Sequence, residues 1–175
     1  LCKVDTVVLD KTGTLTEGVP VVTDSYWISD DNALYLDILY TAEQKSEHPL
    51  ASAIIRWLED SGAKACETEN FESLTGRGVR IQVEGATYWV GSQGLLEIFR
   101  ADIPEKARKE IGWWQEEGQS VVFYGLENRL LAVLAISDRI KPTSANAVKE
   151  LKKQGIEVHL LTGDGIRTAE QVAAT

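Results

Sequence analysis

Three acidic residues follow apolar, strand-like segments of this chain. Asp10 ends the run VVLD, Asp138 follows LLAVLAIS, and Asp164 follows VHLLTG. In open parallel sheets, ligands bind beyond the carboxyl ends of the strands. We therefore expect the three carboxylates to face one crevice, with the hydroxyl groups of Thr14 and Thr162 and nearby backbone amides beside them.

This combination of groups suits phosphoryl transfer. A carboxylate can act as the nucleophile, hydroxyl and amide donors can bind the transferred oxygens, and Mg²⁺ can neutralise their charge. Acids at strand ends are also ordinary loop residues. For Asp138 taken alone, the two interpretations are equally supported.

The segments that would position these residues follow two patterns. The opening segment 4–9 and the closing part of the chain, with a helix over 142–154, a strand over 157–161 and a helix from 166, alternate as in a parallel α/β sheet. The middle of the chain instead predicts short strands and helices without that alternation. Its expected strands are 19–28, 71–74, 79–83, 88–90, 121–126 and 130–136, and its expected helices are 32–42, 49–62 and 104–117.

An insertion explains both patterns. An α/β domain would be begun by residues 1–19, interrupted by an α+β domain over 20–132 that is built on an antiparallel sheet, and resumed by 133–175. We expect the resumed parallel-sheet domain to be incomplete.

Composition limits the classes of function. Hydrophobic residues make up 43% of the 175 residues and charged residues 26%, as in soluble globular proteins. The net charge of −9 argues against a nucleic-acid partner, which requires clustered Lys and Arg. Cys2 and Cys66 have the spacing of neither a metal site nor a disulfide framework. Apolar runs all fall short of the ~18 residues that span a bilayer.

Residues 10–16, DKTGTLT, resemble the phosphorylation motif of P-type ATPases, which are ion pumps built on a haloacid-dehalogenase-like, Rossmann-like catalytic domain. TGD at 162–164 and DRIKP at 138–142 resemble two further motifs of that family. The resemblance implies that Asp10 becomes an aspartyl phosphate. It also implies that Asp10 and the backbone carbonyl of Thr12 hold Mg²⁺.

The same resemblance assigns the neighbouring side chains. Lys11 and Thr14 would contact the phosphate, and Thr162 and Gly163 would bind its oxygens. Phosphatases of the superfamily carry a second Asp two residues after the nucleophile as a general acid/base, and this chain has Thr12 there. Without that proton shuttle, the acyl phosphate should hydrolyse slowly, as a pump requires.

A histidine before a proline is the second candidate site. His48 precedes Pro49 at an expected helix N-terminus, where the helix dipole disfavours a proton on the ring. Such a residue is typical of a surface cap, and it can also stack on an aromatic base. SEHP at 46–49 resembles the nucleotide-domain signature of the heavy-metal branch of P-type ATPases. An ATP pocket would then be lined by Ser46, Glu47 and His48. Ser46 could also cap the helix.

Other parts of that pocket are visible in the sequence. Glu43 stands five residues before His48, as the adenine-contacting glutamate of that branch does. The glycines of TGRGV would let a ligand approach the backbone. Ser92 stands where the branch has Asn. The remaining pocket residues would be Gly76, Arg77, Gly78 and Gly91.

The resemblance implies an ATP-binding and phosphorylated headpiece of a metal pump. ATP would bind the inserted domain and transfer its γ-phosphate to Asp10, with Mg²⁺ as the second cofactor. The transported ion would be copper by preference, or zinc or cadmium. The parent protein would sit in a membrane, with this region a monomer on its cytoplasmic face.

Several family elements are expected to lie outside the chain. These are the transmembrane helices, the Cys-Pro-Cys motif, a later lysine and a second Mg²⁺-binding Asp, and Gly165 stands where Asn is usual. We therefore expect the chain to bind ATP but to phosphorylate itself poorly or not at all.

Two other functions remain open from the sequence. The chain could be a soluble haloacid-dehalogenase-like phosphatase with a cap insertion, although Thr12 and the SEHP pocket count against it. It could also be a nucleotide-binding module without catalysis.

Overall fold

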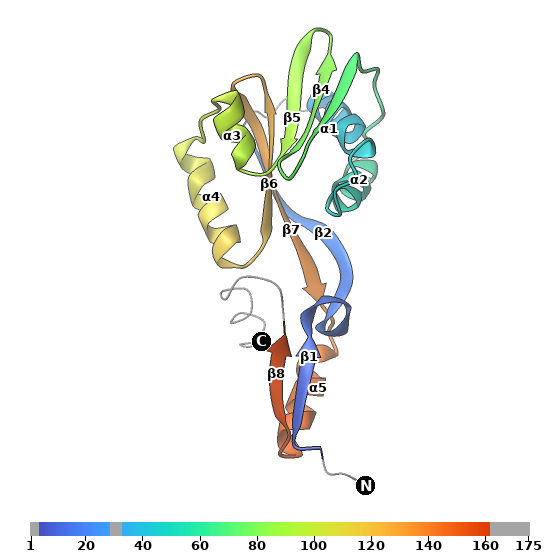
Figure 1. Ribbon diagram of the computed structural model, residues 1–175, viewed down its shortest axis with the longest axis vertical. Coiled ribbons are helices and arrows are strands. Elements are labelled where there is room, and N and C mark those ends of the chain that lie inside the picture. The colour runs from blue at the N-terminus through green and yellow to red at the C-terminus, as the bar shows by residue number, and fades with distance from the viewer. Residues whose placement is uncertain (1–3, 29–32, 162–175) are drawn as a thin grey trace.

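The computed structural model describes residues 4–28 and 33–161. It contains a larger lobe, built on an antiparallel sheet, and a smaller lobe, built on a parallel pair of strands (Figure 1). Two long strands of the larger lobe extend toward the smaller lobe and join the two. The expected combination of a parallel α/β part with an inserted antiparallel α+β part is confirmed.

A six-stranded antiparallel sheet forms the larger lobe, with strand order β2-β7-β6-β5-β4-β3. Each strand predicted for the middle of the chain is present within a few residues. The bounds are β2 (Thr16–Trp27), β3 (Asn70–Leu74), β4 (Gly78–Val83), β5 (Ala86–Gly91), β6 (Ser120–Leu126) and β7 (Arg129–Ile140).

Helices cover both faces of this sheet (Figure 1). On one face lie α1 (Ala33–Gln44) and α2 (Ala51–Asp60), and on the other lie α3 (Gly94–Phe99) and α4 (Glu105–Glu116). The short helix α3 was not predicted, because six residues are too few to display a helical period.

Burial on both faces explains the apolar run 130–136 in β7. Leu134 and Ile136 belong to the core under α1 and α2, whereas Val133 and Ala135 belong to the core under α3 and α4. A continuous apolar run is typical of a parallel strand buried on both faces. Here an antiparallel strand has that pattern because helices lie on both sides of its sheet.

The smaller lobe contains β1 (Thr6–Asp10) and β8 (Glu157–Leu161), which pair in parallel. Helix α5 (Ser144–Lys153) packs against β8. The register aligns Asp10 with Leu161, so both strands end at the same edge. The predicted strand over 157–161 and its parallel pairing are confirmed.

The ends of β2 and β7 form a two-stranded ribbon between the lobes. Pro20 pairs with Asp138 and Thr16 with Ile140, and the register shifts between these two pairs. The turn η1 (Lys11–Leu15) connects this ribbon to β1. Both strands run continuously through the boundaries expected after residues 19 and 132.

We predict opposite effects for two glycine-to-alanine changes. A Cβ at Gly125 would lie 2.1 Å from the ring of buried Trp89, so Gly125→Ala should lower the free energy of unfolding by about 1–3 kcal/mol. Gly112 lies in α4 with nothing within 4 Å of its Cβ position, so Gly112→Ala should raise stability by about 0.5–1 kcal/mol. Urea denaturation measures the free energy of unfolding of both variants. Equal changes in the two variants would contradict the assigned packing of Trp89.

Candidate functional site

Asp10 is the last residue of β1, and its side chain is exposed. Its pairing partner Leu161 is the last residue of β8, so the chain leaves both strands at one edge of the sheet. That edge is where parallel sheets bind ligands. The predicted site residues Thr162, Gly163 and Asp164 lie outside the described residues.

The turn after Asp10 is irregular. Thr12 has an extended backbone (φ −74°, ψ 122°), and Gly13 has a positive φ of 76°, which favours glycine. The backbone N–H of Gly13 donates to Oγ1 of Thr16 at 3.1 Å. Thr12 and Thr14 are both exposed beside Asp10. For Lys11 the described part of the structure is the backbone.

Asp138 does not end a strand of the parallel sheet, and that expectation is wrong. It lies within β7, and its carboxylate accepts hydrogen bonds from the β2 strand of the ribbon. Thr16 Oγ1 donates to Oδ2 at 2.6 Å, and the N–H groups of Gly18 and Val19 donate to Oδ1 at 3.0 and 3.2 Å. The carboxylate of Asp138 therefore shapes the chain that follows the Asp10 turn.

Residues after Asp138 fix the same turn. Lys141 Nζ donates to the carbonyl of Gly13 at 2.6 Å, and the Lys141 N–H donates to the carbonyl of Leu15 at 2.9 Å. Ser144 Oγ also donates to the Leu15 carbonyl, at 2.7 Å. These roles of Lys141 and Ser144 were not predicted from the sequence, although Lys141 lies inside the DRIKP motif.

A cleft of about 630 Å³ lies in the larger lobe. It is bounded by the α1–α2 loop, the β3–β4 turn, and the ends of β5 and β6. Every residue predicted for the nucleotide pocket lines this one cleft. They are Glu43, Ser46, Glu47, His48, Gly76, Arg77, Gly78, Gly91 and Ser92.

The apolar residues that line the cleft were not predicted from the sequence. Ile54, Val79, Val90 and Val122 line it from four different elements. Ser120 joins them at the start of β6. Only the strand order, which places β6 beside β5 and β5 beside β4, brings these positions together, and no local signal in the sequence reveals it.

The imidazole of His48 is held by its own loop. Its Nδ1 accepts a hydrogen bond from the Leu50 N–H at 3.2 Å, which requires Nδ1 to carry no proton. Ser46 Oγ accepts from the His48 N–H at 3.3 Å. Helix α2 begins at Ala51 without a side-chain cap, so the expectation that Ser46 caps it is wrong. The Ser46 hydroxyl instead binds the backbone of the loop that carries His48.

The glycines of the cleft serve different purposes. A Cβ at Gly78 would lie 2.2 Å from the carbonyl oxygen of Val90, and one at Gly91 would lie 2.1 Å from that of Arg77. These two glycines therefore allow β4 and β5 to approach each other. Gly76 has a φ of +70° in a turn closed by the Arg77 N–H, and its Cβ position is open. Only there could a missing side chain leave room for a ligand.

Glu43 lies in the last turn of α1 and is only 5% exposed. Burial raises the pKa of its carboxyl to about 7, and a hydrogen bond from Ser46 opposes the rise. Within the described residues, no cation forms an ion pair with it. A buried carboxyl without a cationic partner favours its neutral form.

The described residues contain no group of three or more His, Cys, Asp or Glu side chains that could hold a metal ion. The Mg²⁺ position that the resemblance implies, Asp10 with the backbone carbonyl of Thr12, is not such a group. Mg²⁺ commonly takes one or two protein carboxylates and completes its shell with water and substrate phosphate. The donors of this turn are compatible with such binding.

Residues 4–175 match the haloacid dehalogenase-like hydrolase family. The chain belongs to this family. It is 36% identical over 170 residues to a copper-exporting P-type ATPase of Staphylococcus epidermidis, covering 97% of the chain and 21% of that protein. It is 41% identical over 180 residues to a copper-exporting P-type ATPase of Legionella pneumophila, covering 99% of the chain and 23% of that protein. The chain spans about a fifth of the length of these relatives.

Solved structures agree with this relationship. A zinc-transporting PIB-type ATPase in its E2.Pi state superposes on 98% of the chain with a TM-score of 0.79 and 31% identity, over 28% of its own length. The N-domain of HMA8, a copper-transporting P-type ATPase, shares the fold over 67% of the chain and 99% of its own length, with a TM-score of 0.56 and 23% identity. The resemblance to heavy-metal P-type ATPases is confirmed.

We predict that Asp138→Ala weakens the hydrogen bonding of the ribbon formed by β2 and β7. Loss of the carboxylate leaves the N–H groups of Gly18 and Val19 without their acceptor, so amide exchange at both positions should be about tenfold faster or more. Asp24→Ala on β2, the strand that contains Gly18 and Val19, is the control, because the exposed Asp24 side chain makes no hydrogen bond within the described residues. Unchanged exchange at Gly18 and Val19, followed by NMR, would refute this role of Asp138.

Glu43 should make stability depend on pH. Because the folded pKa of about 7 lies above the usual 4.5, the neutral form is favoured on folding, and this contribution is lost as pH rises toward 7. Glu43→Gln cannot ionise, so above pH 7 it should unfold with a free energy about 3 kcal/mol higher than the wild type. Chemical denaturation at acidic and alkaline pH tests this. If the difference in free energy of unfolding between Glu43→Gln and the wild type is the same at both pH values, the raised pKa of Glu43 is contradicted.

Proposed function

We propose that this chain is the ATP-binding and phosphorylated headpiece of a heavy-metal-transporting P-type ATPase. The observation that carries the proposal is that all predicted pocket residues line one cleft, while Asp10 lies separately at the carboxyl end of β1. A nucleotide in the larger lobe and a nucleophile in the smaller lobe are the parts required for transfer of a γ-phosphate to an aspartate.

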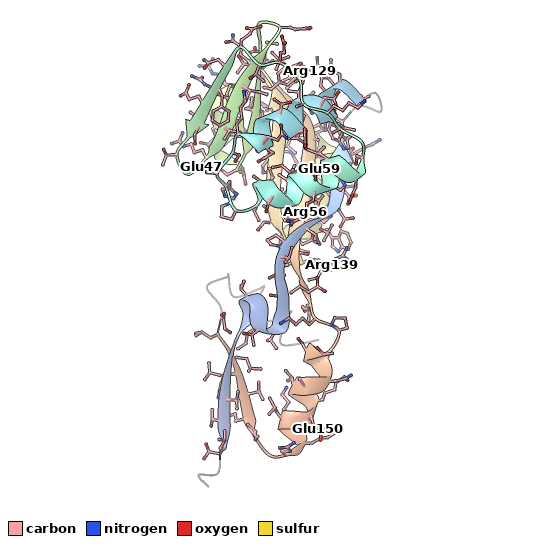
Figure 2. The ribbon with its side chains drawn as sticks, turned by 90° about the vertical axis from the view of Figure 1, so that its right-hand side faces the viewer. Glu47, Arg56, Glu59, Arg129, Arg139 and Glu150 are labelled. Carbon is pink, nitrogen blue, oxygen red and sulfur yellow. The ribbon has the colours of Figure 1, made fainter. Side chains whose placement is uncertain are left out.

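The cleft suits an adenine nucleotide. Apolar side chains such as Val79 and Val122 offer a surface for the base, and the imidazole of His48 can stack on it. Among the described residues that line the cleft, Arg77 is the only Lys or Arg, so it is the side chain that could meet the phosphates. Glu47 lies at the rim of the cleft, in the loop before α2 (Figure 2).

The transfer step is a displacement at phosphorus. A carboxylate oxygen of Asp10 forms a bond to the γ-phosphorus as the bond to the β–γ bridging oxygen breaks, which leaves an aspartyl phosphate and ADP. Bound Mg²⁺ would neutralise charge on the phosphates, and the Asp10 carboxylate and the Thr12 carbonyl would hold it. Because Thr12 cannot act as an acid or base, the aspartyl phosphate would hydrolyse slowly.

In the proposed cycle the ribbon of β2 and β7 would bend to bring the cleft to Asp10, because the two belong to different lobes (Figure 1). Arg56 of α2 reaches the ribbon and donates from Nη2 to the carbonyl of Pro20 at 2.9 Å (Figure 2). Helix α2 also lines the cleft with Ala51 and Ile54. Movement of the nucleotide lobe would therefore be transmitted to the ribbon through α2.

The whole protein would use the phosphorylation cycle to move a metal ion. Copper is favoured, because the relatives from S. epidermidis and L. pneumophila are copper-exporting ATPases, and the zinc-transporting structure keeps zinc as a second candidate. The headpiece would lie at the cytoplasmic face of a membrane. No helix in the part of the chain that is described is long and apolar enough to cross one.

We predict that His48→Ala weakens ATP binding. Loss of the stacking ring should raise the Kd for ATP about tenfold to a hundredfold, measured by isothermal titration calorimetry. His159→Ala is the matched control. His159 is the other histidine of the chain and lies on β8, outside the cleft.

Equal affinities of His48→Ala and the wild type would reject the assignment of the cleft to adenine. Turnover of a generic phosphate ester by the chain, abolished in Asp10→Asn, would instead favour a soluble phosphatase.

A further inference from the structure

A second cavity lies in the larger lobe, apart from the cleft described above. Its volume is about 410 Å³, and it is bounded by the start of α1, the loop between α2 and β3, and the turn between β4 and β5. Figure 1 shows this turn at the end of the larger lobe farthest from the smaller lobe. Among the described residues, none lines both hollows. Strand β4, for example, contributes Val79 to the cleft and Val83 to the cavity.

Apolar side chains form one wall of this cavity. Leu34 and Ile38 lie one helical turn apart on α1, and Val83 pairs with Ala86 across the turn between β4 and β5. Leu34 is 61% exposed, so this wall is open to solvent. The volume lies within the range of about 300–1,000 Å³ that ligand pockets have, and such pockets combine an apolar lining with a few polar groups.

A buried hydroxyl group in the cavity has no partner. Tyr88 lines the cavity and is only 7% exposed, yet its hydroxyl makes no hydrogen bond within the described residues. The neighbouring Tyr124 differs, because its hydroxyl donates to the carbonyl of Tyr35 at 3.1 Å. Burial is the main cause of a raised pKa of Tyr88, and Tyr35 and Glu84 add to the rise, so the hydroxyl keeps its proton. Buried polar groups are usually satisfied, which leaves this hydroxyl available to a ligand.

Three exposed acids also line the cavity. They are Glu67, Glu69 and Glu84. Among the described residues that line it there is no Lys, Arg or His, and within the same part of the chain none of the three acids forms an ion pair. Lys45 reaches this loop but contacts the hydroxyl of Thr68. Carboxylates gathered at a cavity with low-dielectric walls favour a cationic ligand.

We propose that this cavity binds a small organic amine in its protonated form. The ammonium group meets the carboxylates of Glu67 and Glu84, and the apolar body lies against Leu34 and Ile38. A polar group on that body hydrogen-bonds to the hydroxyl of Tyr88. Because each exposed carboxylate contributes little alone, selectivity requires the charge, the apolar wall and the buried hydroxyl together. The proposal does not depend on the nucleotide function of the cleft.

Probes of similar size separate charge from shape. Tyramine is a cation with a hydroxyl-bearing ring, 4-ethylphenol lacks the ammonium group, and 4-hydroxyphenylpropionate carries a carboxylate in its place. Tyramine should bind with a Kd in the low millimolar range, about tenfold more tightly than 4-ethylphenol, and the anion should not bind. NMR titration of the complete chain at low salt measures each Kd. The shifted amides should fall within 34–38, 66–69 and 83–88.

Removal of the charges tests the acids. In the double variant Glu67→Gln/Glu84→Gln, tyramine should bind no more tightly than 4-ethylphenol. The double variant Glu97→Gln/Glu105→Gln is the matched control, because it removes the same charge from exposed acids of α3 and α4. These helices cover the other face of the sheet, so the control should retain the wild-type preference for tyramine.

Tyr88→Phe tests the buried hydroxyl. The variant keeps the ring in the core and removes the hydrogen-bonding group. Phenethylamine is tyramine without its hydroxyl, and the wild type should bind tyramine about fivefold to tenfold more tightly than phenethylamine. Tyr88→Phe should bind the two amines alike. A merely structural role of Tyr88 predicts instead that both amines lose affinity equally.

Several results would overturn the proposal. They are the absence of saturable shifts at tyramine concentrations about tenfold above the expected Kd, binding of the anion as tight as that of tyramine, and shifts confined to the cleft. Retention of the tyramine preference in Glu67→Gln/Glu84→Gln would also reject it. Binding of tetralysine at these residues without binding of tyramine would assign the surface to a basic protein segment and reject the small-molecule site. ATP binding is measured separately, so each of these failures leaves the proposed function intact.

Discussion

The antiparallel pairing of β2 with β7 holds the two lobes of this chain together. The pairing joins residues more than a hundred positions apart, and Asp138 secures it by accepting hydrogen bonds from Thr16, Gly18 and Val19. Lys141 and Ser144 then tie the turn after Asp10 to the same segment. The position of Asp10 therefore depends on a ribbon that also carries the larger lobe.

This arrangement separates two chemical environments. The cleft combines the buried carboxyl of Glu43 with apolar strand residues. Asp10 instead lies exposed at the end of a parallel pair, where a charged phosphate and a hydrated cation can reach it. One ribbon, formed by β2 and β7, connects the two environments. A two-stranded ribbon, which lacks further strands to brace it, is suited to bending.

Much of this could be predicted from the sequence. The strand ending at Asp10, the strand over 157–161 and the separate strands of the inserted lobe follow from local periodicity, and the residues of the cleft follow from motifs. Asp138 was misplaced because its strand is buried on both faces by helices and so has the apolar run of a parallel strand. Gly78 was interpreted as a site of ligand approach, whereas its close contact with Val90 depends on the pairing of β4 with β5. Both errors concern partners that are distant in sequence or depend on strand order, which local patterns do not encode.

The central claim is that an adenine nucleotide binds in the larger lobe, apart from Asp10. Photolabelling of the chain with 8-azido-ATP, followed by peptide mapping, tests this claim most directly. The account predicts that the label falls on peptides carrying residues 43–54, 73–79, 90–92 or 120–122, and that excess ATP prevents labelling. ATP-protected labelling confined to the peptides of β1, α5 or β8 would contradict it.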